Sequence, residues 1–320
     1  MTRKFTSIGN FRSHAAGFSL VELMVALALG LLILAALLES FNSNSATGTT
    51  NTRFTEVQTN GRYATDFMRR EIQHAGFLGL SWIALKKSGA TGTADYGCGA
   101  GFVTKIEQPI WGSNDVNALS CIASADYARG DVLVLRRLGL EPVPSVPPVP
   151  PSCATASPAC AANKLYVRTE FLQGTVFLGT TAPPVNLQPP FEDYPLAADV
   201  YYISSYTTAL GDGVPALKRL TLGAGPAMSS PQVIASGIEN MQIQYGVVTL
   251  GAVNFLNASA VPATDWPNVV AVRLWLLARS TDPEYNGFTN TSTYAMGDQT
   301  VTMSDNFPRQ VFPLVVQLRR

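Results

Sequence analysis

A run of 21 residues near the N-terminus, Phe18 to Leu38, contains a single ionisable side chain, that of Glu22. As an α-helix this run is roughly 31 Å long, which matches the hydrocarbon core of a bilayer. The residues before it are polar and include Arg3, Lys4 and Arg12, without an acidic residue. Because basic residues stay on the cytoplasmic side of a membrane helix, the sequence predicts one inner-membrane span with the rest of the chain outside the cytoplasm.

Two simpler explanations of this run fit less well. The apolar core of a secretory signal peptide has about 7 to 15 residues, fewer than here. A plain membrane anchor has no use for a carboxylate, which is costly inside a membrane unless a partner offsets its charge. The position of Glu22 therefore indicates that its carboxylate has a function and meets a group that offsets its charge.

The seven residues from Gly17 to Leu23, GFSLVEL, resemble the class III signal of type IV prepilins. The resemblance implies that a membrane prepilin peptidase cuts between Gly17 and Phe18 and that the new N-terminal amine of Phe18 is methylated. It also implies that the apolar helix is kept and that Glu22 faces the positive N-terminus of a neighbouring subunit. The physics agrees, because an amine and a carboxylate are each costly in lipid and their contact relieves both costs.

No proline occurs from Phe18 through Gly76, so one long helix is possible. The stretch from Asn42 to Thr52 contains poor helix formers and Gly48, and it is the predicted weak point. Gly76 and Gly79 are predicted to end the helix. Apolar residues in the second half recur at steps of three and four, or their sums, which predicts a stripe that packs on a sheet of the same chain. The stripe consists of Phe54, Val57, Ala64, Met68, Ile72 and Ala75.

Beyond Gly79, short alternating apolar runs separated by Gly, Pro, Asn and Asp predict antiparallel strands. The predicted strands are Asp131 to Arg136, Lys164 to Leu172, Asp199 to Ser204, Ala216 to Leu222, Ile238 to Val248, Val269 to Arg279 and Gln310 to Leu318. Pro313 predicts an edge or a bulge in the last of them.

The expected fold class is α+β and pilin-like, with a long N-terminal helix, half transmembrane and half amphipathic, packed on a C-terminal antiparallel β-sheet domain. The expected parts are a leader over 1–17, a membrane and assembly helix over 18–38, its amphipathic continuation over 39–79 and a periplasmic or extracellular domain over 80–320.

The four cysteines are even in number and include no C-x-x-C pair, which favours two disulfides in an oxidising compartment over a zinc site. Cys153 and Cys160 have a spacing that suits a local loop, which leaves Cys98 and Cys121 as the second pair. Of the three possible connectivities, this one closes the shortest loops. The proline-rich segment from Glu141 to Pro151 predicts an extended connector, with a partner ligand as the alternative.

Composition and motifs exclude several functions. Removal of the basic leader changes the formal charge from +0 to about −3, opposite to a nucleic-acid binder. The segment from Asp282 to Gly287 begins like a calcium loop, but Thr293 stands where that loop needs Glu. No P-loop or nucleophile motif occurs, so we expect no enzyme, no cofactor and no metal site.

The C-terminal third resembles the PilW minor pilins of type IV pili, in segments that are loose one by one but informative in their order. These segments are Ile238 to Asn240, Gln244 to Gly246, Leu277 to Ser280, Gly297 to Val301, Arg309 to Phe312 and Val316 to Arg319. The resemblance implies a role in priming pilus assembly, a place at or near the pilus tip, and support of adhesion or twitching motility. The implied partners are prepilin peptidase, other minor pilins, the major pilin and a tip adhesin. The chain would move from the inner membrane, with its domain in the periplasm, to the pilus.

Two alternatives remain open from sequence. A minor pseudopilin of a type II secretion system shares the signal and the helix, although its domain is usually shorter. A receptor or sensor with one anchor would not need a cut between Gly17 and Phe18.

Overall fold

The computed structural model describes residues 17, 19–81, 86–90, 98, 102, 104–143, 153, 160–161, 163–179, 190–223, 228–284 and 287–318. By its internal contacts the chain divides into a first unit, Met1–Thr50, and a second unit, Asn51–Arg320. The two units are described separately below. The predicted connector from Glu141 to Pro151 lies mostly outside the described residues.

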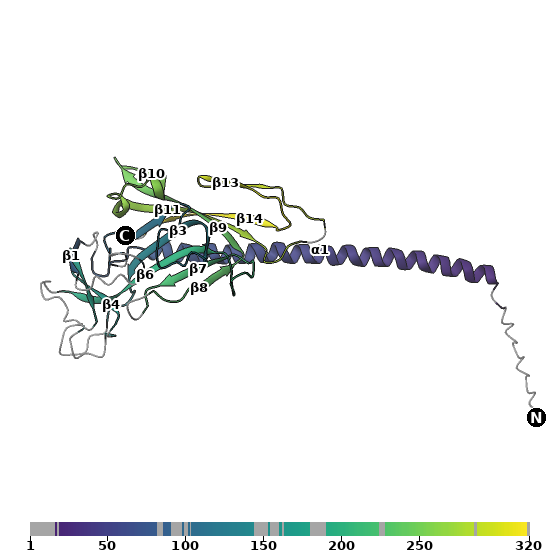
Figure 1. The fold of residues 1–320 in the computed structure, drawn as a ribbon, viewed down its shortest axis with the longest axis horizontal. Coiled ribbons are helices and arrows are strands. Elements are labelled where there is room, and N and C mark those ends of the chain that lie inside the picture. Colours follow the sequence, from purple (N-terminus) through teal and green to yellow (C-terminus); the bar gives the residue numbers. More distant parts are fainter. Residues whose placement is uncertain are drawn as a thin grey trace, which may run out of the picture. The chain divides into compact units, whose positions relative to one another are not determined.

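The helix α1 spans Leu20–His74 and is continuous through the predicted weak point (Figure 1). The hydroxyl groups of Thr47, Thr49 and Thr50 donate to the backbone carbonyl oxygens four residues earlier, at 2.9 to 3.0 Å. These bonds satisfy side chains that otherwise compete with the helix for backbone groups. The helix ends before Gly76, whose φ of 78° only glycine adopts freely, as the sequence predicts.

The part of α1 in the second unit buries most of the predicted stripe. Val57 is 1% exposed and Ala64, Met68, Ile72 and Ala75 are 0% exposed, whereas Phe54 is 40% exposed. The stripe prediction is therefore confirmed except at Phe54. Gly61 is also buried on this face, where a Cβ would overlap the ring of Phe312. The helix approaches the sheet closely at Gly61, which a search for apolar residues misses.

The larger sheet of the second unit has eight strands, in the order β1-β5-β4-β6-β3-β2, with β7 paired to β6 and β8 paired to β7. All neighbours are antiparallel except β1 and β5. Its strands are β1 (Lys86–Ala90), β2 (Ile110–Ser113), β3 (Tyr127–Leu138), β4 (Leu165–Thr169), β5 (Gln173–Leu178), β6 (Glu192–Ser204), β7 (Ala216–Thr221) and β8 (Gln232–Ser236).

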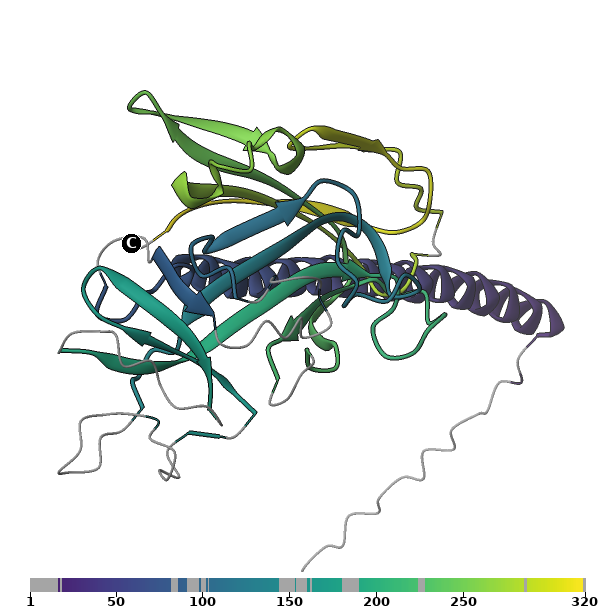
Figure 2. The ribbon, with the colours of Figure 1, turned by 60° about the vertical axis from the view of Figure 1, so that its left-hand side comes forward.

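The second sheet is antiparallel, with the order β10-β9-β11-β14, and a separate hairpin pairs β12 with β13. The strands are β9 (Ile238–Thr249), β10 (Ala252–Asn257), β11 (Val269–Arg279), β12 (Thr293–Met296), β13 (Gln299–Thr302) and β14 (Arg309–Gln317), with two 3₁₀ turns, η1 (Ala258–Ala260) and η2 (Trp266–Asn268), between β10 and β11. Pro313 lies in β14 at the sheet edge, as predicted. Figure 2 shows the strands of this unit gathered along the C-terminal part of α1.

One hydrophobic core joins α1 to the inner faces of both sheets, with Met68, Leu135, Tyr201, Tyr245 and Leu274 among its members. A second core covers the other face of the eight-stranded sheet with residues from 98 to 122. Both faces of the central strands β3 and β6 are therefore buried, which explains why their sequences are apolar without clear alternation. The α+β prediction, with a long helix on antiparallel sheets, is confirmed.

The strand β9 departs from expectation on one face. Met241, Ile243 and Tyr245 point into the core, as alternation predicts. Asn240 and Gln242, which the alternation of a strand places on the opposite, outward face, are only 2% and 0% exposed. Gly297, in the turn between β12 and β13, lies against the Gln242 side chain, so a segment distant in sequence covers this polar face.

Candidate processing and assembly sites

The predicted cleavage site lies at the start of α1. Gly17 and Ser19 are described, and Phe18 lies outside the described residues. The Ser19 N–H donates to Glu22 Oε2 at 3.2 Å, and the Val21 N–H donates to Ser19 Oγ at 3.4 Å. This reciprocal pattern satisfies N–H groups that a helix N-terminus leaves without partners. In the single chain, Glu22 thus binds its own helix start, and an amine from a neighbour would have to share or replace that contact.

The N-terminal part of α1 has no apolar partner in the first unit. Each large apolar side chain described from Leu20 to Leu38 is between 53% and 73% exposed. The most apolar window of α1 has a mean hydropathy of 2.7 and is 0% buried, and α1 is the one described helix long and apolar enough to cross a membrane. Lipid or the helices of other subunits would have to cover this surface.

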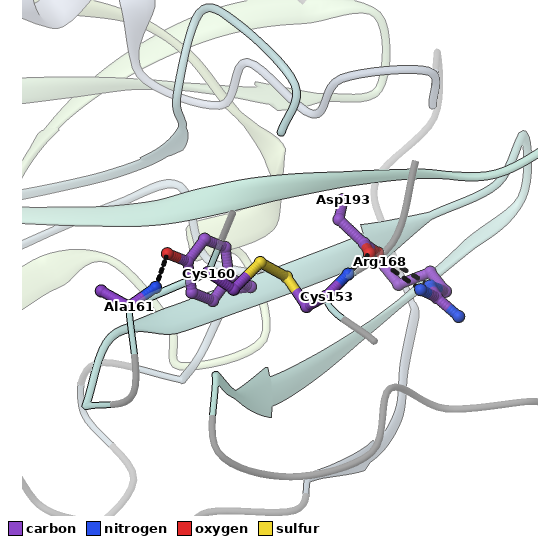
Figure 3. Close-up of a disulfide and its surroundings, with 6 residues drawn as sticks. Cys153, Cys160, Ala161, Arg168 and Asp193 are labelled. Atoms are coloured by element: carbon purple, nitrogen blue, oxygen red, sulfur yellow. Dashed lines mark hydrogen bonds and ion pairs between the residues drawn. A yellow bond between two sulfur atoms is a disulfide. The ribbon is translucent and has the colours of Figure 1, made fainter. Parts of the chain in front are cut away.

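The disulfide Cys153–Cys160 is attached to a buried ion pair (Figure 3). Arg168 on β4 donates to both carboxylate oxygens of Asp193 on β6, at 2.7 and 2.8 Å. The Cys153 N–H donates to Asp193 Oδ2 at 3.0 Å, and Asp193 is 0% exposed. Since a buried carboxylate is stable only with all its donors in place, the disulfide fixes one donor of this group.

The disulfide Cys98–Cys121 belongs to the segment that covers the eight-stranded sheet. Beneath it, the Arg136 guanidinium donates to the carbonyl oxygens of Phe102 and Gln108 at 2.9 and 2.8 Å. Burial lowers the pKa of Arg136 to about 10, still high enough to keep it charged. The structure therefore contains the two pairs that the sequence favours, and each closes a loop that packs against the eight-stranded sheet.

A polar cluster between the two sheets was not expected from sequence. Asp131 on β3 accepts the N–H groups of Asp115 and Ile243, at 3.0 and 2.7 Å, and so joins the loop after β2 to β9. Burial raises the pKa of Asp131 to about 7, and the negative charges of Asp115 and Asp298 add to this shift. These carboxylates come from three distant segments, so no sequence motif could have shown their contact.

Two protein families match parts of the chain. Residues 12–38 match the prokaryotic N-terminal methylation motif, and residues 200–320 match the family of type IV pilus-assembly protein W. The C-terminal third of this chain is thus similar to PilW-type pilus-assembly proteins, and its N-terminal part carries the methylation motif. Among solved structures, a type IV-like pilin from Thermus thermophilus is similar at 13% identity, with 83% of this chain and 96% of that chain covered and a TM-score of 0.34. No curated protein sequence matches the chain.

The two matched families concern pilus assembly and N-terminal methylation, and neither describes a catalytic activity of the matched chain. Its methylation motif implies processing by prepilin peptidase, and the apolar helix is consistent with the inner membrane and the pilus. The resemblances noted from sequence are confirmed at this level. The cut after Gly17, the methylation of Phe18, the pairing of Glu22 and the domain boundaries stay predictions.

Proposed function

We propose that this chain is a minor pilin that takes part in priming type IV pilus assembly and lies at or near the pilus tip. The observation that carries the proposal is the match of residues 200–320 to type IV pilus-assembly protein W, since this region contains the second sheet and the hairpin. The match gives no comparable support to the pseudopilin alternative.

The large size of the second unit favours a position at the end of the filament. It contains sheets of eight and four strands, a separate hairpin and two disulfides. A shaft subunit must offer matching contacts above and below, repeated along the filament, and a bulky head crowds such an array. An end subunit needs contacts on one side only, so one copy per filament is enough.

The helix supplies the means of joining other subunits. Its exposed apolar side chains suit first the membrane and then the helices of neighbouring pilins. Glu22 would meet the N-terminal amine of a neighbour in place of, or beside, the Ser19 N–H that it now accepts. The proposed partners are other minor pilins, the major pilin and a tip adhesin, and the proposed role at the cell surface is support of adhesion or motility.

Deletion of the gene tests this proposal. We expect a sharp loss of surface pili, with partial recovery when pilus retraction is also blocked, because the defect lies in initiation. Immunogold labelling of an epitope-tagged chain should mark filament ends. Even labelling along the filaments, or normal piliation after deletion, would refute the proposed place and role.

A further inference from the structure

A small cavity of about 200 Å³ lies where the two sheets of the second unit meet. Arg129 on β3 reaches it from the eight-stranded sheet, and Glu239 on β9 and Arg279 on β11 reach it from the four-stranded sheet. Ser205, which follows β6, and Gly213, which precedes β7, form part of its wall. Two cationic side chains from different sheets therefore line one small cavity.

The guanidinium group of Arg279 is held in place but is only partly used. Its Nη2 donates to the carbonyl oxygen of Gly213, and its Cζ lies 4.0 Å from the centre of the Phe307 ring. Nε is buried without a hydrogen-bond partner, and Nη1 forms no hydrogen bond within the described part of the chain. Burial lowers the pKa of Arg279, which reflects the cost of holding this charge away from water. Nη1 is therefore available to a ligand in the cavity.

The charges around Arg279 do not balance. The groups that act on it are the carboxylates of Glu239 and Asp305 and the guanidinium groups of Arg129 and Arg309. Arg309 binds both carboxylates, with 2.6 Å between Nε and Glu239 Oε2 and 2.6 Å between Nη1 and Asp305 Oδ1. Arg129 Nη1 lies 4.0 Å from Glu239 Oε1, too far for a hydrogen bond. One positive charge is thus in excess, and it lies on the two arginines that line the cavity.

We infer that Arg129 and Arg279 form a binding site for a small oxyanion, a phosphate, sulfate or carboxylate group. Guanidinium groups bind these anions through short, charge-assisted hydrogen bonds. The excess of one positive charge matches one such group, and a cavity of about 200 Å³ suits a single group rather than an extended polyanion. Glu239 does not compete for the site, because Arg309 already offsets its charge.

A bound oxyanion would join the two sheets of the second unit. It would bridge β3 to β11, whose strands belong to different sheets. Since the two arginines meet only in the folded chain, the anion would bind the folded state and raise its stability by mass action. A free ion and an acidic group at the end of a larger molecule offer the same chemistry, so the probes below separate tetrahedral anions from carboxylates.

Calorimetric titration of sodium phosphate, sodium sulfate and sodium acetate, each separately, into the full chain in detergent tests the inference. Sodium chloride holds the ionic strength constant, because salt screens any non-specific attraction. Two charge-assisted hydrogen bonds correspond to a dissociation constant of about 1 mM, so titration to about 10 mM covers the range. The variants are Arg129→Gln and Arg279→Gln. The control is Arg69→Gln on α1, because the Arg69 side chain is 47% exposed and that of Arg129 is 54% exposed.

We expect saturable binding of at least one of the three anions, weakened about tenfold in Arg129→Gln and in Arg279→Gln but unchanged in Arg69→Gln. The same anion should raise the urea midpoint of the unmodified chain above its value in chloride. Binding of phosphate or sulfate without acetate would assign the site to tetrahedral oxyanions, and binding of acetate at similar strength would assign it to carboxylates as well.

Absence of binding by all three anions up to about 10 mM would overturn the inference, since even two hydrogen bonds should be detected there. Binding that Arg129→Gln leaves unchanged would overturn it too. Arg129 is exposed and forms no hydrogen bond within the described residues, so its substitution should leave the fold intact, which circular dichroism checks. The test therefore holds even where Arg279→Gln, which loses the contacts to Gly213 and Phe307, folds poorly.

Discussion

The contact between Gly61 and Phe312 gives a sharp test of how α1 packs on the second sheet. Gly61 is buried, and a Cβ added to it would lie within 3.0 Å of the Phe312 ring, closer than real Cβ atoms approach. Phe312 is 9% exposed and lies on β14 opposite Leu276 of β11, so its ring has little room to move. The substitution Gly61→Ala should therefore displace the ring or the helix.

The expected magnitude combines two opposing effects. Forcing an extra methyl group into a packed core costs about 1–3 kcal/mol. Alanine in a helix is about 1 kcal/mol more favourable than glycine. Gly61→Ala should thus lower the free energy of unfolding by about 1 kcal/mol, within a range of about 0–2. The matched control is Gly48→Ala in the same helix, where a Cβ would meet nothing within 4 Å. That substitution should leave stability unchanged or raise it by up to about 1 kcal/mol.

Urea unfolding of the full chain in detergent, followed by tryptophan fluorescence, measures these differences. A double-mutant cycle with Phe312→Leu isolates the contact, because leucine lacks the outer ring atoms that block position 61. In the Phe312→Leu background, Gly61→Ala should become neutral or stabilising, which corresponds to a coupling energy of about 1–3 kcal/mol. Equal effects of Gly61→Ala in both backgrounds would show that the close approach does not limit packing at this site.

Four further predictions concern processing, assembly and stability. Intact mass spectrometry of the membrane-derived protein should find 303 residues beginning with methylated Phe18, since a cut before it removes 17 of the 320 residues; a chain that keeps its leader would contradict this. Glu22→Leu should leave insertion and cleavage intact but reduce co-purification with other pilins, and equal recovery would argue against pairing. Cys153→Ser should lower stability by about 2–5 kcal/mol, because the loop that positions a donor to Asp193 is released, and an unchanged urea midpoint would count against it. Burial raises the pKa of the Asp199 carboxyl from 3.8 to about 6, so the folded chain binds this proton more tightly than the unfolded chain does. The free energy of unfolding should therefore rise as pH falls from about 6 to 4. Asp199→Asn should flatten this pH dependence, which urea midpoints measured across pH would reveal.

Periodicity predicted the fold well wherever one side of an element meets the core. The buried stripe of α1 follows directly from apolar residues that recur every three or four positions. The inner face of β11 follows in the same way from apolar residues at every second position. Gly61 carries no apolar signal, although its missing side chain is what admits Phe312. The burial of Asn240 and Gln242 depends on a hairpin more than 50 residues away, which local alternation cannot indicate. The polar cluster around Asp131, which joins segments far apart in sequence, was missed for the same reason.

The two units differ in how much of their apolar surface is buried and in how their charged groups are paired, and this difference separates their roles. In the first unit, the apolar side chains of α1 are more than half exposed, so contact with lipid or other helices would gain free energy there. In the second unit, most large apolar side chains are buried and charged groups such as Arg168 and Asp193 are paired inside the unit. Substitutions in the first unit should therefore act mainly on insertion and assembly. Substitutions in the second should act mainly on its folding.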